Sequence, residues 1–264
     1  MILNTVEFEI SYIFFQAVAN VPHTWVPKSR LAALKDKVNS RPLRIGFVGS
    51  SHARRICKIE RKARRLVGFP NKIAFFGRGG ITARHLNEDS GYMDEAIHAD
   101  TDIAILFCGS NDVDNQYALR IGGRMFAQRI LDNWYYLDSR EVITFAFGIG
   151  ERYRVQHITQ KQYHTLSNTI NTHLAKWLPE GRYLNFRARH QDLYFDGVHC
   201  TDEGYISLLD LINERINALL AQNVGDENEN LPPINLDVGD FVDDNPEPVL
   251  EYIDYNPQPA IQYD

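Results

Sequence analysis

The sequence predicts a three-layer α/β/α sandwich built on a five-stranded parallel sheet. Short apolar runs with the length of buried strands alternate with longer segments that have helical periodicity. Strands that alternate with helices in this way form parallel sheets covered on both faces. A chain of 264 residues, 44% of them hydrophobic, is long enough to bury a full core under such a sheet.

The elements follow from these patterns in chain order. The first strand, 43–48, is the run Leu-Arg-Ile-Gly-Phe-Val, and a glycine and two serines lead from it into a helix expected over 52–66. The last helix carries isoleucine and leucine at helical spacing from Ile206 to Leu219, which predicts a buried stripe. This last helix is expected over 202–221, and the other helices are expected at 82–97, 116–137 and 159–177. The other strands are expected at 72–76, 103–108, 141–146 and 182–186.

The chain divides into an N-terminal extension (1–41), a central domain (42–221) and an acidic tail (222–264). In the extension, Leu31 to Leu34 predicts a short helix after Pro27 that packs on the core or serves as an interface. The apolar run from Ile10 to Val18 is shorter than the ~20 residues that span a bilayer, and no basic region precedes it. We therefore expect no membrane partner and an intracellular location.

The tail differs in charge from the rest of the chain. It has 11 of the 34 acidic residues and no lysine or arginine, so residues 1–221 carry a net charge of +5 and the tail −11. High net charge and repeated prolines favour disorder. An acidic segment that docks on a basic surface or a partner is the alternative.

Polar residues follow two of the predicted strands, where a parallel sheet binds ligands. Gly49-Ser50-Ser51-His52 follows the first strand, and Gly109-Ser110-Asn111-Asp112 follows the strand at 103–108. A helix that starts at the first of these positions adds backbone N–H donors and a dipole that favours negative charge. The sequence thus predicts a hydroxyl and a side-chain amide at one edge of the sheet.

A carboxylate and an imidazole lie three residues apart in Asp196-Gly197-Val198-His199. One turn of chain lets the carboxylate accept from one imidazole nitrogen while the other nitrogen faces a serine. A serine hydrolase needs a nucleophile, a base, a group that orients the base, and donors for the oxyanion. Ser51 and His199 are 148 positions apart, so the fold must bring them together.

From residue 44 to residue 216 these segments resemble the consensus blocks of the SGNH hydrolase superfamily, the GDSL-like esterases and lipases. The resemblance implies a flavodoxin-like strand order, Ser51 as nucleophile, His199 as base and Asp196 as its orienting group. It also implies an oxyanion hole made by the N–H groups of Ser51 and Gly80 and the amide of Asn111. Within the family, the start Gly-Ser-Ser-His-x-x-Arg is similar to that of esterase-like domains in animal mobile elements.

One position departs from the family pattern, which usually has Asp just before the nucleophile where this chain has Ser50. The substitution removes no proton-transfer group, but it makes Ser50 a rival nucleophile. Alignment with the family serine favours Ser51.

The resemblance implies a serine esterase that hydrolyses a carboxylic ester, with a small-molecule substrate and no metal or organic cofactor. An acetyl or other short acyl group is favoured over a long lipid. The alternative is a weakly active or inactive SGNH-like module that binds nucleic acid through the basic helix at 52–66. The cations of this helix could instead recognise an anionic substrate, or they could simply form a solvated helix face. The loop at 148–154 is expected in the pocket wall.

Overall fold

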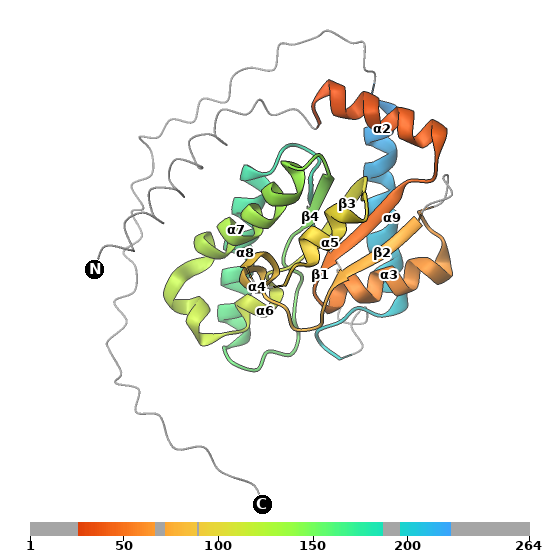
Figure 1. The fold of residues 1–264 in the computed structure, drawn as a ribbon. Coiled ribbons are helices and arrows are strands. Elements are labelled where there is room, and N and C mark those ends of the chain that lie inside the picture. The colour runs from red at the N-terminus through yellow and green to blue at the C-terminus, as the bar shows by residue number, and fades with distance from the viewer. Residues whose placement is uncertain (1–25, 67–71, 89, 187–195, 223–264) are drawn as a thin grey trace, which may run out of the picture. The chain divides into compact units, whose positions relative to one another are not determined.

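Five parallel strands form one sheet in the order β2-β1-β3-β4-β5 (Figure 1). The computed structural model describes residues 26–66, 72–88, 90–186 and 196–222, and the account below concerns these residues. This strand order is that of flavodoxin-like doubly wound sheets. The predicted fold class and the implied strand order are therefore confirmed. The strands are β1 (Arg44–Gly49), β2 (Lys72–Gly77), β3 (Ile103–Phe107), β4 (Ile143–Phe147) and β5 (Tyr183–Leu184).

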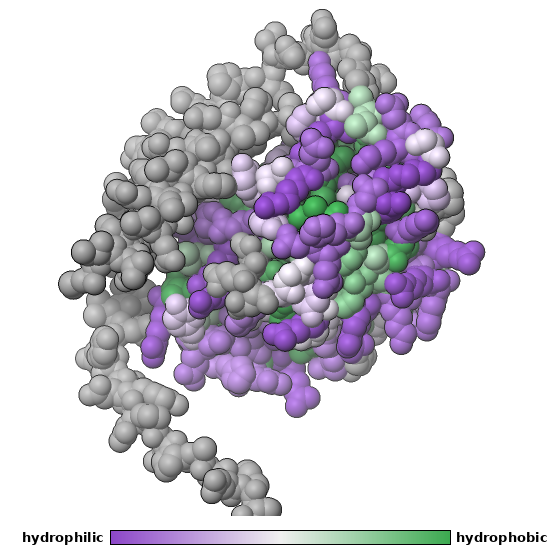
Figure 2. All heavy atoms as spheres, viewed as in Figure 1, coloured by the Kyte–Doolittle hydropathy of each residue, from purple (hydrophilic) through white to green (hydrophobic). Residues whose placement is uncertain are grey.

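Helices cover both faces of the sheet, and hydrophilic residues make up most of the coloured surface in Figure 2. Successive strand residues point to opposite faces, so Ile105 packs in one core cluster and Ala104 and Leu106 in the other. The first face is covered by α2 (Lys28–Ser40), α3 (Ser51–Ala63) and α9 (Asp202–Ala221). The second is covered by α4 (Ala83–Glu88), α5 (Tyr92–His98), α7 (Gln116–Asp138) and α8 (Gln160–Trp177).

The prediction of a single helix over 82–97 is wrong, because α4 ends at Glu88 and α5 begins at Tyr92. Gly91, the residue before α5, has φ of +67°, a left-handed conformation that a continuous α-helix does not contain. A four-residue helix that the sequence did not predict, α6 (Ser110–Val113), follows β3.

The helix α2 is longer than the short helix predicted at 31–34. Its Leu31 and Leu34 are buried in the same core cluster as β1 and α9. Arg30 also pairs with Asp138 at the end of α7, with 3.0 Å between nitrogen and oxygen. The described part of the N-terminal extension therefore packs on the central domain. Residues 1–25 and the tail beyond Gln222 lie outside the described residues.

The turn from β1 into α3 depends on Gly49. This residue has φ of +128°, and a Cβ built on it would lie 2.0 Å from the carbonyl oxygen of Phe107 in the neighbouring strand. Only glycine allows the two backbones to approach so closely. The next residue, Ser50, donates its N–H to the same carbonyl at 2.9 Å. The first residues of α3 are thus fixed at the carboxyl edge of the sheet.

Candidate active site

The structure brings Ser51 and His199 together. Ser51 is the first residue of α3, and His199 lies just before α9. The distance between Ser51 Oγ and His199 Nε2 is 2.8 Å, which is a hydrogen bond. Two segments 148 positions apart in the chain therefore meet at the carboxyl edge of the sheet.

Asp196 lies on the other side of the imidazole. His199 Nδ1 is 2.7 Å from Asp196 Oδ2, and the N–H groups of Val198 and His199 donate to Asp196 Oδ1 at 2.9 and 2.6 Å. Burial alone would raise the pKa of Asp196, but these hydrogen bonds lower it to about 2. The carboxylate is thus ionised at neutral pH and holds the Nδ1–H tautomer, so that Nε2 accepts the proton of Ser51.

The imidazole of His199 is neutral at pH 7. Burial lowers its pKa, the negative charge of Asp196 raises it, and the positive charges of Arg55 and Arg152 lower it, with a net downward shift. A neutral imidazole beside a serine hydroxyl can act as a general base. The turn that carries it is held in place because Gly197 O accepts the N–H groups of Tyr153 and Arg154, at 2.7 and 3.1 Å.

Asn111 lies in α6 on the same edge of the sheet. Its Nδ2 donates to the carbonyl oxygen of Ile81 at 3.0 Å, and its Oδ1 accepts from Arg152 Nη2 at 2.9 Å. Gly80 precedes Ile81 and is exposed, three residues beyond the end of β2. The amide is therefore bonded to the residue next to Gly80, and the oxyanion function of both groups stays a prediction.

Solved structures match this chain, whereas no protein-family model and no curated protein does. A proposed acylhydrolase from Bacteroides fragilis is 16% identical with a TM-score of 0.53, over 76% of this chain and 98% of that one. A GDSL-like lipase from Bacteroides thetaiotaomicron is 16% identical with a TM-score of 0.51, over 74% and 99%. A carbohydrate acetylesterase from Sinorhizobium meliloti is 15% identical with a TM-score of 0.50, over 68% and 100%.

The chain has the SGNH hydrolase fold. Identities of 15 to 16% show the fold alone. The resemblance inferred from the sequence is confirmed at the level of the fold.

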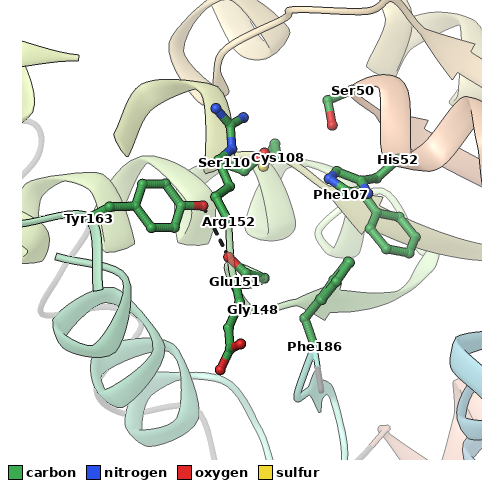
Figure 3. Close-up of a pocket in the computed structure, with 11 residues that line it drawn as sticks. Ser50, His52, Phe107, Cys108, Ser110, Gly148, Glu151, Arg152, Tyr163 and Phe186 are labelled. Carbon is green, nitrogen blue, oxygen red and sulfur yellow. Dashed lines mark hydrogen bonds between the residues drawn. The ribbon is translucent and has the colours of Figure 1, made fainter. Parts of the chain in front are cut away.

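Ser50, which replaces the usual aspartate of the SGNH pattern, is only 2% exposed. It lines a cavity of about 10 Å³ together with His52, Arg152 and two phenylalanines, Phe107 and Phe186 (Figure 3). A space of this size holds about one water molecule. Ser51, and not Ser50, has the hydroxyl hydrogen-bonded to His199, which favours Ser51 in the choice that the sequence left open.

His52 is neutral and buried behind the site. Its Nδ1 is 3.0 Å from the hydroxyl of Tyr205, and its ring lies edge-on to Phe186 with 5.2 Å between centroids. Burial lowers its pKa to about 3, and the neighbouring His199 and the positive charge of Arg152 act in the same direction. The structure thus gives His52 a packing and hydrogen-bonding position beside the cavity.

The sequence did not connect Asp114 with the site, and it did not indicate that Arg152 contacts Asn111. The loop at 148–154 was expected in the pocket wall, and Arg152 does line the cavity (Figure 3). Its pairing with Asp114 and Asn111 spans 38 and 41 positions, so no local spacing indicates it.

The basic residues of α3 are mostly exposed. Arg55 is half-buried and close enough to lower the pKa of His199, whereas the others are exposed. The exposed cations of this helix and its C-terminal end are Arg54, Lys58, Arg61, Lys62, Arg64 and Arg65. Among the described helices, none combines the length and apolar character needed to cross a bilayer.

Proposed function

We propose that the protein is a serine esterase that hydrolyses a carboxylic ester with a short acyl group. The observation that carries this proposal is the hydrogen-bonded chain from Ser51 Oγ through the His199 imidazole to the Asp196 carboxylate, with links of 2.8 and 2.7 Å. This arrangement activates a serine hydroxyl for acyl transfer. A fold shared with solved esterases and lipases supports it.

In the proposed mechanism, His199 takes the proton of Ser51 Oγ as this oxygen attacks the ester carbonyl carbon. The N–H groups of Ser51 and Gly80 and the amide of Asn111 stabilise the oxyanion that forms. The protonated His199 then gives its proton to the leaving alcohol, and an acyl-enzyme remains. Water, deprotonated by the same imidazole, releases the acid and restores Ser51.

A short acyl group agrees with one of the solved structures that this chain resembles. That protein is a carbohydrate acetylesterase, which agrees with an acetyl substrate.

Hydrolysis of p-nitrophenyl acetate, butyrate and octanoate by the purified protein tests the proposal. We expect kcat/KM to fall with acyl length, and Ser51→Ala to lower it by about a thousandfold or more. Ser50→Ala is the matched control, since it removes the neighbouring hydroxyl and should keep activity within about threefold. A fluorophosphonate should label wild type and Ser50→Ala but not Ser51→Ala. Labelling that persists in Ser51→Ala would contradict the proposal.

The nucleic-acid alternative is less well supported. The exposed cations of α3 are compatible with it, but a binding module has no need of a serine, a histidine and an aspartate in hydrogen-bonded contact. Binding to nucleic acid predicts an affinity that falls steeply with salt and is lost when Arg61, Arg64 and Arg65 are changed to glutamate. Absent or salt-insensitive binding would reject this alternative.

A further inference from the structure

Arg152 is a buried cation whose guanidinium reaches two side chains. Only 7% of the residue is exposed. Its Nη2 donates to Asn111 Oδ1 at 2.9 Å and its Nη1 donates to Asp114 Oδ2 at 3.1 Å. One planar group thus connects the loop after β4 with the segment after β3 that carries Asn111.

The guanidinium decides which way the Asn111 amide faces. A guanidinium has five N–H donors and no acceptor, so the group of Asn111 that faces it must be the carbonyl oxygen. The NH2 group then points away from the guanidinium, and one of its hydrogens bonds to Ile81 O at 3.0 Å. A half-turn of the amide would place NH2 against the guanidinium and oxygen against the Ile81 carbonyl, and both hydrogen bonds would be lost. The second hydrogen of the NH2 group is the one that would donate to the oxyanion in the proposed mechanism.

Arg152 is itself held from two sides. Asp114, its ion-pair partner, also accepts the N–H groups of Gln156 and His157, at 3.1 and 3.0 Å. The carbonyl oxygen of Arg152 accepts from the side chain of Gln160 at the start of α8. The guanidinium carbon also lies 5.7 Å from the centre of the Tyr163 ring, and both side chains line the pocket in Figure 3.

We propose that Arg152 is a positioning residue that fixes the Asn111 amide with its NH2 group directed to the oxyanion. This inference rests on the proposed esterase function. Arg152 acts on the transition state through Asn111, which donates to charge that develops only as the serine attacks. Removal of the guanidinium should therefore lower kcat and leave KM nearly unchanged.

The test compares Arg152→Met, Asn111→Ala and the double variant with wild type on p-nitrophenyl acetate. We expect Asn111→Ala to lower kcat about a hundredfold and Arg152→Met to lower it about 10- to 30-fold, each with KM within about twofold. If Arg152 acts through Asn111, the double variant should be no slower than Asn111→Ala alone. Arg140→Met, which removes an exposed arginine two residues after α7, should leave kcat unchanged.

Two further variants separate positioning from a general structural effect. Arg152→Lys retains the charge but cannot bond to Asn111 and Asp114 in the same forked geometry, so we expect an intermediate kcat. Asn111→Asp keeps an acceptor for Arg152 and removes the NH2 donor, so its kcat should be no higher than that of Asn111→Ala. Thermal unfolding shows which variants are folded, and Arg152→Lys carries the test if Arg152→Met does not fold.

The outcomes are distinct. Losses of kcat that multiply in the double variant would overturn the inference, because Arg152 would then act independently of Asn111. Wild-type kcat in Arg152→Met with an active wild-type enzyme would also overturn it and leave the esterase function intact. A wild-type protein that neither turns over ester nor reacts with a fluorophosphonate would overturn both.

Discussion

Replacement of Asp112 by asparagine should change how the stability of the protein depends on pH. Asp112 lies in α6 beside Asn111 and is 5% exposed. Its Oδ2 accepts the N–H of Ala83 at 2.8 Å. Burial raises the pKa of this carboxyl from 3.8 to about 6, against the smaller opposing effect of that hydrogen bond. The folded protein therefore binds a proton at this site more tightly than the unfolded chain does.

The sign of the effect follows from the two pKa values. Below about pH 3.8 the carboxyl is protonated in both states and costs nothing, whereas above about pH 6 it is ionised in both states and the folded state bears the cost of a buried charge. Stability from this group is thus lost as the pH rises from about 4 to about 6. With about 1.4 kcal/mol for each pKa unit, the whole cost is about 3 kcal/mol, of which about 2 kcal/mol falls between pH 4.5 and pH 7.5.

Urea unfolding of wild type and Asp112→Asn at pH 4.5 and pH 7.5 measures this term. The asparagine oxygen can still accept from Ala83, and any fixed cost of its new NH2 group is the same at both pH values. His52, whose pKa is lowered to about 3, gives wild type an opposite slope in this range, so only the difference between the two proteins isolates Asp112. We expect the free energy of unfolding of Asp112→Asn, relative to wild type, to rise by about 2 kcal/mol from pH 4.5 to pH 7.5. A difference that does not change with pH would refute the reasoning.

Three further predictions concern the base, the turn after β1 and a buried ion pair. Because burial lowers the pKa of His199, kcat/KM should rise with pH and level off with a midpoint below 6.5, and a midpoint at or above 6.5 would contradict a neutral base in this setting. Gly49→Ala should cost about 4 kcal/mol or more or prevent folding, because its Cβ would lie 2.0 Å from Phe107 O; a soluble variant with wild-type circular dichroism and melting temperature would disprove it. Arg182→Met should lower the free energy of unfolding by about 2 kcal/mol or more, since Arg182 is 1% exposed and donates to Asp138 at 3.1 Å, and urea unfolding with a loss below about 0.5 kcal/mol would count against it.

The strands and most of the helices were predictable from the sequence because their signals are local. The strand β3 is an unbroken apolar run that is buried along its whole length. The helix α8 is capped by Thr159, whose hydroxyl accepts the N–H of Gln162, and the Gln162 side chain accepts the N–H of Thr159 in return. All the residues of this cap lie within four positions of the sequence. The prediction of one helix over 82–97 was wrong. The segment has helical periodicity, but the left-handed conformation of Gly91 divides it into two helices.

The site was predictable to the extent that its parts are short segments. Asp196 and His199 lie within one turn, so their contact could be expected from spacing, and the strand before Ser51 placed its hydroxyl at a sheet edge. The contact of Ser51 with His199 depends on the order of the strands, for which the sequence offered only a resemblance.

The sequence by itself determined the alternation of strands and helices, the glycine turn after β1 and the residues available for chemistry, because each of these depends on neighbours a few positions apart. Tertiary structure alone decided that Arg152 faces Asn111 and Asp114, and that Leu31 and Leu34 of α2 join the core. Such contacts depend on the register of strands and on charges buried together from distant segments. These contacts form only when the sheet is assembled, so no local sequence pattern predicts them.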